Sequence, residues 1–241
     1  MKYRSIFYSQ YASTQATRDV SNLAQKFEQE KKQFAREILP LIPKKTNLRI
    51  VDIGCGNGSL LAALNQKGYE NTQGIDIAPD QVALAHSFGV KQVVQADLLQ
   101  FLAQNPDTFD VVLGMDIIEH FTKDELVELL QNIRNALKTD GFCLFRTPNA
   151  DAVFSSIFIA GDFTHENQLN GYSARQVMAN CNFRLVQVLA AHIQTVGFFR
   201  ECLRMVAWFY IKTACKLIVF ASGRSTKNVL FSPNLLIKAF K

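Results

Sequence analysis

The feature that most constrains this chain is a glycine-rich turn between a short apolar run and a helical stretch. Residues 48–53 form a short, mainly apolar run with β-branched residues, residues 54–58 read Gly-Cys-Gly-Asn-Gly, and residues 59–67 have helical spacing. Glycine permits sharp turns and close approach of a ligand, which a Cβ atom would obstruct. This order predicts a βα unit of an open parallel sheet, where ligands bind beyond the carboxyl ends of the strands.

The same alternation of apolar runs and amphipathic stretches continues along the chain and predicts one α/β domain. A chain of 241 residues that is 48% hydrophobic can bury a sizeable single core. Strands are expected at residues 72–77, 92–95, 109–115, 142–146, 183–191 and 234–240, and a turn at 138–141. Helices are expected at about 20–39, 79–87, after residue 97, 123–137 and 173–180.

Composition narrows the class of protein. The formal net charge of +5 is mildly basic, short of what a dedicated nucleic-acid-binding fold carries, so no nucleic-acid partner is expected. Five cysteines without Cys-x-x-Cys spacing indicate neither a disulfide framework nor a metal site. The first residues lack the apolar core of a signal peptide, and we therefore expect a cytoplasmic protein.

Acidic residues follow the first three strands, where a ligand would bind. Asp52 is placed to hold the glycine loop or to accept a hydrogen bond from an ammonium group. Asp76, 18 residues after Gly58, can take both hydroxyls of a ribose, and Asp97 can accept an adenine amino group while Leu98 packs on the ring. The alternative role of Asp76 and Asp97 is to cap the helices that follow them.

These motifs resemble those of the class I S-adenosylmethionine-dependent methyltransferases, from about residue 48 to residue 149. Residues 51–58 are similar to the family's first motif, 74–77 to its second, 95–98 to its third and 109–112 to its fourth strand. The resemblance implies a Rossmann-like, seven-stranded, mostly parallel sheet with helices on both faces and an antiparallel last strand. A nicotinamide-binding domain would prefer Gly-x-Gly-x-x-Gly, whereas this loop reads Gly-x-Gly-x-Gly.

The resemblance also implies S-adenosylmethionine as the cofactor and a division of the single domain 1–241. Residues 1–45 would form an N-terminal lid or packed arm rich in aromatics, 46–150 the cofactor-binding core, and 151–241 the acceptor side. The expected cofactor-binding residues are Asp52, Gly54, Cys55, Gly56, Gly58, Asp76, Ile77, Asp97, Leu98, Met115 and Asp116. Cys55 and Cys143 are interpreted as small buried residues.

Two histidines are candidates for catalysis. His120 ends the segment that follows the fourth strand, and its Glu119-His120 pair resembles that of small-molecule O-methyltransferases, some of which use a divalent metal. No metal site is assigned, although Asp116, Glu119 and His120 could be ligands, and a structural role for His120 is the alternative. His165, in the long connection after the fifth strand, is the first choice of general base because a histidine titrates near neutral pH.

A basic, aromatic segment at about 197–223 interrupts the chain before the last strand. Residues 198–220 have the composition of an interfacial helix that could lie on the inner face of a membrane, with a subunit-interface or core helix as the alternative. Together with residues 162–166 it resembles methyltransferases of bacterial polysaccharide assembly, which implies O-methylation of a sugar or glycan, lipid-linked or free. The alternative acceptor is a small lipophilic phenol such as a quinone precursor, and the alternative to an enzyme is a non-catalytic cofactor-binding protein. The segment could also form a homodimer.

Overall fold

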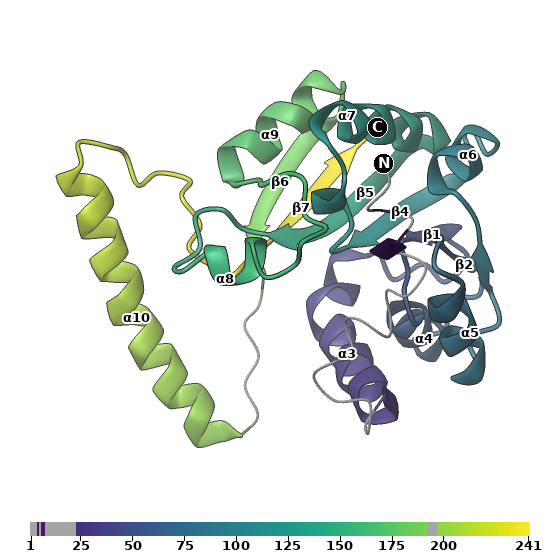
Figure 1. Ribbon diagram of the computed structural model, residues 1–241, viewed down its shortest axis with the longest axis horizontal. Coiled ribbons are helices and arrows are strands. Elements are labelled where there is room, and N and C mark those ends of the chain that lie inside the picture. Colours follow the sequence, from purple (N-terminus) through teal and green to yellow (C-terminus); the bar gives the residue numbers. More distant parts are fainter. Residues whose placement is uncertain (1–3, 5, 8–22, 192–196) are drawn as a thin grey trace.

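The computed structural model describes residues 4, 6–7, 23–191 and 197–241, and these build one seven-stranded sheet (Figure 1). The strand order is β3-β2-β1-β4-β5-β7-β6. The strands are β1 (Ile50–Ile53), β2 (Thr72–Asp76), β3 (Val93–Gln95), β4 (Phe109–Met115), β5 (Leu137–Pro148), β6 (Arg184–Ala190) and β7 (Asn234–Phe240). This is the class I methyltransferase fold that the sequence predicted.

The first five strands are parallel, and β7 enters between β5 and β6 with the opposite direction. β7 pairs with β5 through Phe142 opposite Phe240 and with β6 through Val188 opposite Ile237, both antiparallel. The prediction of a mostly parallel sheet with an antiparallel last strand is therefore confirmed. β7 thus extends the sheet beyond β5 by antiparallel pairing, which, unlike parallel pairing, does not require a crossover helix between neighbouring strands.

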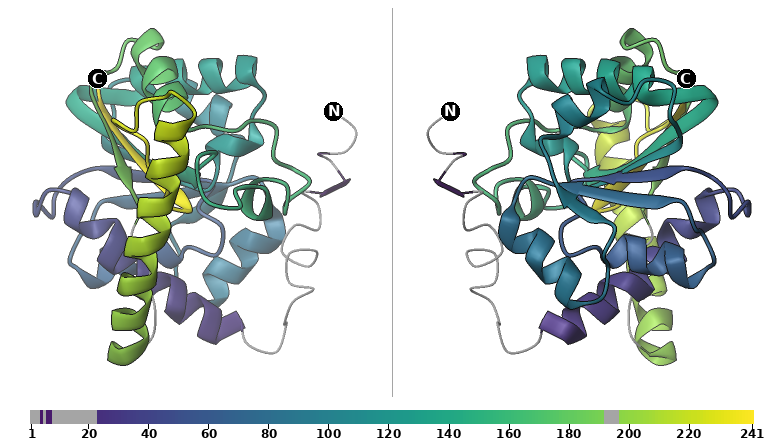
Figure 2. Two further views of the ribbon diagram at one scale, coloured as in Figure 1. Left: turned by 90° about the vertical axis from the view of Figure 1, so that its left-hand side faces the viewer. Right: turned by 90° about the vertical axis from the view of Figure 1, so that its right-hand side faces the viewer.

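Helices cover both faces of the sheet (Figure 2), and each layer has its own apolar core. One face carries α3 (Leu23–Glu37), η3 (Leu39–Leu41), α4 (Ser59–Gln66) and α5 (Pro79–Ser87). The other carries α6 (Leu98–Ala103), α7 (Lys123–Ala136) and α9 (Gly171–Asn180). All four residues of β1 are buried, as expected for a central strand of a sheet covered on both faces.

Most predicted element bounds are confirmed to within two residues. Two of the differences, at β5 and at α9, have identifiable reasons. The turn expected at 138–141 belongs to the beginning of β5, where the pairing register with β4 shifts between Phe109 and Val111 and Asp140 takes a φ of 64°. Helix α9 begins two residues before the predicted position because the side chain of Asn170 caps it. The domain division at residues 45 and 150 stays a prediction.

Helix α10 (Phe198–Ala221) lies between β6 and β7 in the sequence and stands apart from the sheet and its helices (Figure 1). None of its residues is buried. The expected helix is confirmed, and the alternative that it packs in this chain's own core is wrong. Among the described residues, the structure contains no helix with the length and apolar character needed to cross a membrane.

Candidate active site

The glycine loop between β1 and α4 has the backbone that the sequence predicted. Gly54 and Gly56 have φ values of 64° and 53°, in the left-handed region that side chains with a Cβ rarely adopt. A Cβ on Gly54 would lie 2.7 Å from Cδ1 of Ile117, so packing also requires glycine there. Among the described residues, a Cβ on Gly56 would meet only Oε1 of Gln81, at 3.7 Å, so this part of the chain leaves space at the turn for a ligand.

Asp76 at the end of β2 holds the glycine loop. One carboxylate oxygen accepts a hydrogen bond from the Gly56 amide at 2.8 Å, and the other accepts one from the Ala78 amide at 2.9 Å. Burial raises the pKa of Asp76, although these two amide bonds act to lower it. Ala78, not Asp76, occupies the N-cap position of α5, so the capping alternative is wrong for this residue.

A second carboxylate, that of Asp52, lies beneath the loop, and one of its oxygens accepts no hydrogen bond from the described residues. It is 2% exposed, and its Oδ1 atom has no hydrogen-bond partner among the described residues. Burial raises its pKa, and the nearby charge of Asp76 raises it further. A buried carboxylate oxygen without a donor is costly, and an ammonium group of a ligand would supply that donor.

Asp52 and the glycine loop line an open cavity at the carboxyl ends of β1 and β4, with α3 on its other side, and Asp76 lies outside this lining. Of the predicted cofactor-binding residues, the cavity lining includes Asp52, Gly54, Cys55, Gly56, Met115 and Asp116. Cys55 and Cys143 are both buried, as predicted, and burial raises the pKa of each thiol. Helix α3 contributes Lys26, Glu30 and Phe34 to the lining, which the sequence did not indicate.

The remaining predicted cofactor residues lie at the same edge of the sheet but outside this lining. Asp97 is exposed and its carboxylate caps α6 by accepting a hydrogen bond from the Gln100 amide at 3.0 Å, which is the alternative role named for it. Ile77 is 52% exposed, and Leu98 packs against the core beneath α6 and α7. Gly58 is buried at the start of α4. The contacts of these residues with a cofactor stay predictions.

An arginine that the sequence analysis missed organises the cavity wall. Arg146 on β5 is paired in register with Met115 on β4, and its guanidinium forms an ion pair with Asp116 and another with Glu37 of α3 at 3.2 Å. The guanidinium also lies 4.8 Å from the ring centroid of Phe34. Burial alone would lower the pKa of Arg146, but the two carboxylates raise it. An arginine at the end of an otherwise apolar strand was the available signal.

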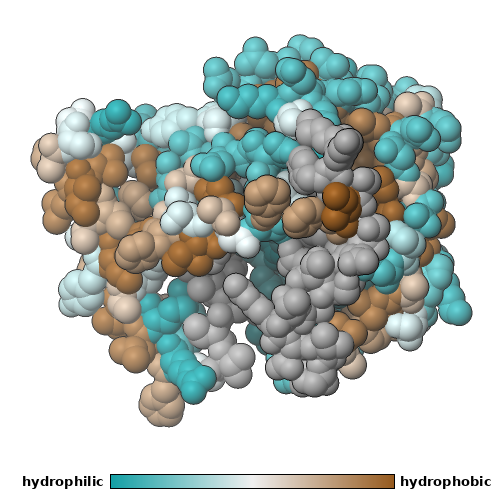
Figure 3. Space-filling view, viewed as in Figure 1, coloured by the Kyte–Doolittle hydropathy of each residue, from teal (hydrophilic) through white to brown (hydrophobic). Residues whose placement is uncertain are grey.

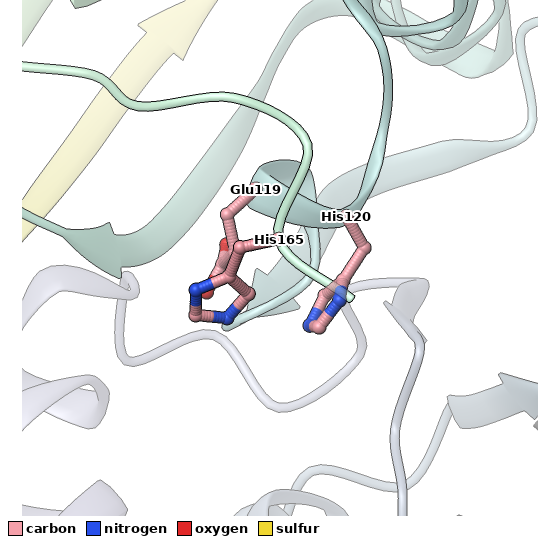
Figure 4. A group of neighbouring side chains, drawn as sticks. All are labelled: Glu119, His120 and His165. Carbon is pink, nitrogen blue, oxygen red and sulfur yellow. The ribbon is translucent and has the colours of Figure 1, made fainter. Parts of the chain in front are cut away.

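The histidines lie beside this wall, in a cluster built by two segments. His120 and Glu119 belong to η4 (Ile118–His120) directly after β4, and His165 belongs to the connection between β5 and α9. Figure 4 shows the three side chains projecting into the same space from these two segments. One ligand atom from each of the three lies within 4.8 Å of the others, and the two imidazole rings are 4.9 Å apart.

The hydrogen bonds around the histidines determine which ring nitrogens carry protons. The Thr164 hydroxyl lies 2.6 Å from Oδ1 of Asp162, whose pKa is lowered in part by the bonds it accepts from Thr164, so the hydroxyl donates to the carboxylate. That hydroxyl must then accept from Nδ1 of His120 at 2.9 Å, which makes Nε2 the basic nitrogen. Nδ1 of His165 lies 2.8 Å from the carbonyl oxygen of Ile159, which can only accept, so its Nε2 is basic too.

Glu119 is the buried acid of this cluster. Its Oε2 atom accepts a hydrogen bond from the Thr147 hydroxyl at 3.0 Å, and its Oε1 atom has no partner among the described residues. Burial, and then the charge of Asp116, raise the pKa of Glu119. Burial, and then the proximity of His165, lower the pKa of His120. Burial therefore favours the neutral forms of Glu119 and His120, and a cation bound beside Glu119 would favour its carboxylate form.

The connection that carries His165 is anchored by residues that the sequence analysis did not single out. The Asn167 side-chain amide donates to the carbonyl oxygens of Ile118 and Phe121, both at 2.7 Å, and the Glu166 amide donates to the Glu119 carbonyl at 2.8 Å. These bonds hold the connection against η4. A buried asparagine in an irregular segment leaves no recognisable pattern in the sequence.

The N-terminal segment reaches the same place. Arg4 pairs with Glu125 and donates to the carbonyl oxygen of His120 at 3.0 Å, and the rings of Phe7 and Phe163 stack at 5.6 Å. Arg4 and Phe7 therefore pack on the acceptor side of the site. Tyr3, Tyr8 and Tyr11, which the lid hypothesis includes, lie outside the described residues.

The sequence and the fold can be compared with those of known proteins. A family model described as a methyltransferase domain matches residues 25–199. The chain belongs to this family. A methyltransferase described as S-adenosylmethionine-dependent, from Archaeoglobus fulgidus, has the same fold, with a TM-score of 0.66, 24% identity, and coverage of 89% of this chain and 94% of that one. Family and fold together identify a methyltransferase domain with the class I fold.

Two curated relatives carry the name ubiquinone biosynthesis O-methyltransferase. The one from Xylella fastidiosa is 35% identical over 77 residues, which cover 30% of this chain and 31% of that protein. The one from Azorhizobium caulinodans is 31% identical over 132 residues, which cover 53% of this chain and 51% of that protein. The methyltransferase domain thus spans about half or less of the curated relatives' own lengths.

The structure also decides between roles named for other residues of the methyltransferase domain. Nδ1 of His120 lies 3.3 Å from the Thr164 carbonyl oxygen, the backbone contact expected of a structural histidine, and the His120 ring lies edge-on to the ring of His165. The side-chain amide of Asn149 at the end of β5 donates to the carbonyl oxygens of Leu230 and Ser232, so it holds the chain before β7. Asp116 is held by Arg146 and is not part of the Glu119, His120 and His165 group.

Proposed function

We propose that this chain is an S-adenosylmethionine-dependent O-methyltransferase in which His165 or His120 removes the proton of an acceptor hydroxyl. The observation that carries the proposal is the pair of histidines whose Nδ1 atoms are tied to Thr164 and Ile159, leaving both Nε2 atoms basic. A methyl transfer to a neutral hydroxyl needs such a base, aligned with the reacting atoms.

The cavity supplies the cofactor's polar contacts. S-adenosylmethionine provides an electrophilic methyl group on a sulfonium when it is bound. Asp52 offers its unpartnered Oδ1 atom to the ammonium group, and the open turn at Gly56 admits the methionine part. Asp76 keeps the loop in this shape and has lone pairs left for a ribose hydroxyl, while Asp97 and Leu98 at the neighbouring strand end are assigned to adenine.

The histidines would receive the proton of the acceptor hydroxyl. A histidine Nε2 atom would accept the hydroxyl proton as the acceptor oxygen bonds to the methyl carbon, and a bound cofactor would supply that carbon, its sulfur keeping the electron pair of the former carbon–sulfur bond. For His120 the resulting positive charge is stabilised through Thr164 by the Asp162 carboxylate. His165 is half-buried and so more accessible to an acceptor than the buried His120, which keeps it the first choice.

The same group of side chains fits a divalent metal, which related O-methyltransferases suggest as an alternative. Glu119, His120 and His165 would hold it, because histidine ligands characteristically donate their other ring nitrogen to a protein acceptor, as both do here. The orphaned Oε1 atom of Glu119 also fits this role. A metal held there would polarise vicinal hydroxyls of an acceptor.

For the acceptor, the comparisons favour a small lipophilic phenol, such as a quinone precursor, over the sugar or glycan that the sequence analysis placed first. The relatives described above carry the name ubiquinone biosynthesis O-methyltransferase, and neither of them is named for polysaccharide assembly. A lipid-linked glycan stays a second candidate because both kinds of acceptor are amphiphilic. The cytoplasm stays the expected compartment.

Cofactor binding is tested first by isothermal titration of S-adenosylmethionine into the wild type, Asp52→Asn and Asp76→Ala. We expect micromolar binding that both variants weaken, and Asp124→Asn, an exposed acid at the start of α7, serves as the matched control without effect. Absence of binding by the well-folded wild type would contradict the methyltransferase proposal.

Turnover is then measured with tritiated cofactor, a dihydroxybenzoate and methyl glycosides, with and without a chelator. We expect transfer to the phenol, and His165→Gln should lower kcat by about 10²–10⁴-fold at unchanged cofactor affinity. Loss of activity with chelator that returns with magnesium or zinc would assign the metal. Cofactor binding without product from any acceptor would favour a non-catalytic protein.

A further inference from the structure

Helix α10 carries a continuous apolar surface that no described part of this chain covers. Five apolar side chains along its length, Phe199, Leu203, Val206, Tyr210 and Leu217, are between 56% and 86% exposed. Monomeric proteins rarely expose large contiguous apolar patches without a partner for them. The helix falls almost wholly beyond residue 199, where the match to the family model ends, so the methyltransferase fold does not require it.

The charges of α10 are confined to one half of its circumference. With about 100° per residue, its five charged residues fall within one half-turn, and the opposite half has none. The charged residues are Arg200, Glu201, Arg204, Lys212 and Lys216. Because Glu201 is paired with Arg204, the cationic character of the helix comes mainly from the other three bases. The charged positions extend over four turns of the helix, so its polar side is a line along the axis rather than one charged end.

The apolar surface continues next to the helix. Figure 3 shows hydrophobic residues over α10 and over the neighbouring region of α8 (Ser156–Ile159), which lies on the same side of the molecule in Figure 1. In and beside α8, Phe154, Ile157 and Phe163 are 75%, 66% and 76% exposed. Phe163 is two residues before His165, so this surface borders the acceptor side of the site.

We propose that α10 is a membrane-docking helix that lies flat on an anionic lipid bilayer, with its uncharged half among the acyl chains and its bases at the lipid phosphates. A helix with bases on one side and aromatic and aliphatic residues on the other has the composition of such interfacial helices. The bases are complementary to the negative surface of an anionic leaflet. The proposal does not depend on which acceptor the enzyme uses.

The distribution of charge favours a bilayer over a second copy of this chain. In a symmetric pair of α10 helices, the bases flanking the apolar contact would approach one another, and the one acid of the helix is already neutralised by Arg204. An anionic surface instead supplies a counter-charge to Arg200, Lys212 and Lys216 along the whole helix. Tyrosines such as Tyr210, in the uncharged half of the helix, are typical of the membrane–water interface.

The test is binding of the full chain to vesicles of phosphatidylcholine alone or with about a third phosphatidylglycerol, measured by flotation. We expect flotation with the anionic vesicles. Because each base near such a surface is worth about 1 kcal/mol, Arg200→Gln/Lys212→Gln/Lys216→Gln should weaken binding on the order of 100-fold.

Two further variants separate charge, apolar contact and folding. Phe199→Gln/Val206→Gln/Leu217→Gln keeps good helix formers and should abolish flotation while cofactor binding stays at the wild-type value. Lys67→Gln/Lys91→Gln/Lys123→Gln removes three exposed bases elsewhere and should bind vesicles like the wild type.

Three results would overturn the proposal. The first is wild-type protein that binds cofactor but not anionic vesicles, and the second is vesicle binding that survives the Phe199, Val206 and Leu217 substitutions. The third is a dimer in lipid-free sedimentation velocity that those substitutions dissociate while vesicle binding is absent, which would make a second copy the occupant of the helix.

Discussion

Strand β1 and helix α10 are both rich in apolar residues, yet every residue of β1 is buried and no residue of α10 is. The side chains of β1 are enclosed by β2, β4 and the helices on both faces, and its one polar member, Asp52, faces the cofactor cavity. Those of α10 lie in the open. Hydrophobic residues thus stabilise the fold in one region and form a surface available for binding in the other.

The largest expected difference concerns two phenylalanines. Phe145 on β5 has no exposed surface, whereas Phe199 on α10 is 86% exposed. Phe145→Ala should lower the free energy of unfolding by about 3–5 kcal/mol through lost burial and a cavity, and Phe199→Ala by less than about 0.5 kcal/mol. Urea denaturation measures both. Equal losses would mean that α10 packs against the body in solution.

A second matched pair compares two arginines. Arg146→Ala leaves the buried Glu37 carboxylate without its cation, which should cost about 3–5 kcal/mol of unfolding free energy. Arg204→Ala breaks an ion pair with Glu201, three positions earlier in the same helix, which should cost less than about 0.5 kcal/mol of unfolding free energy. Chemical denaturation at low and high salt distinguishes them. A small effect at Arg146 would show that the Glu37 and Asp116 charges are screened by water.

Threonine side chains provide a smaller contrast. Thr122 caps α7 in a reciprocal bond with Glu125, so Thr122→Ala should lower the melting temperature in line with about 1 kcal/mol. The hydroxyl of Thr213 in α10 bonds only to the Phe209 carbonyl of its own helix, and Thr213→Ala should leave the melting temperature within error. A comparable drop in both variants would argue against the separation of the two regions.

The smallest effect concerns a single proton in the buried cluster. The folded-state pKa of His120 is lowered, first by burial, so its contribution to stability is present above the unfolded pKa of about 6.5 and is lost as the pH falls through the folded value. The wild type should therefore lose part of its advantage over His120→Gln when unfolding is measured at decreasing pH. His86→Gln, at an exposed histidine on α5, is the control, and the same trend in it would contradict this assignment.

Much of the fold and part of the site could be predicted from the sequence because local patterns encode them. Strand β4, helix α5 and strand β7 have the predicted bounds, since an apolar run, a proline in the first turn or a β-branched stretch is read within a few residues. The glycine loop and Asp52 were placed correctly at the cavity for the same reason. The role of Asp97 was harder to assign, because capping and ligand binding use the same side-chain atoms.

What the sequence by itself determined is the order of strands and helices, the family motifs and the amphipathic character of residues 198–221. Only the tertiary structure decided that Arg146 joins Glu37 across 109 positions, and that His120 and His165, 45 positions apart, share one space with Glu119. It also decided that α10 stays outside the core. Periodicity reports which residues share a face of an element, whereas the partner of that face is determined by contacts between distant parts of the chain.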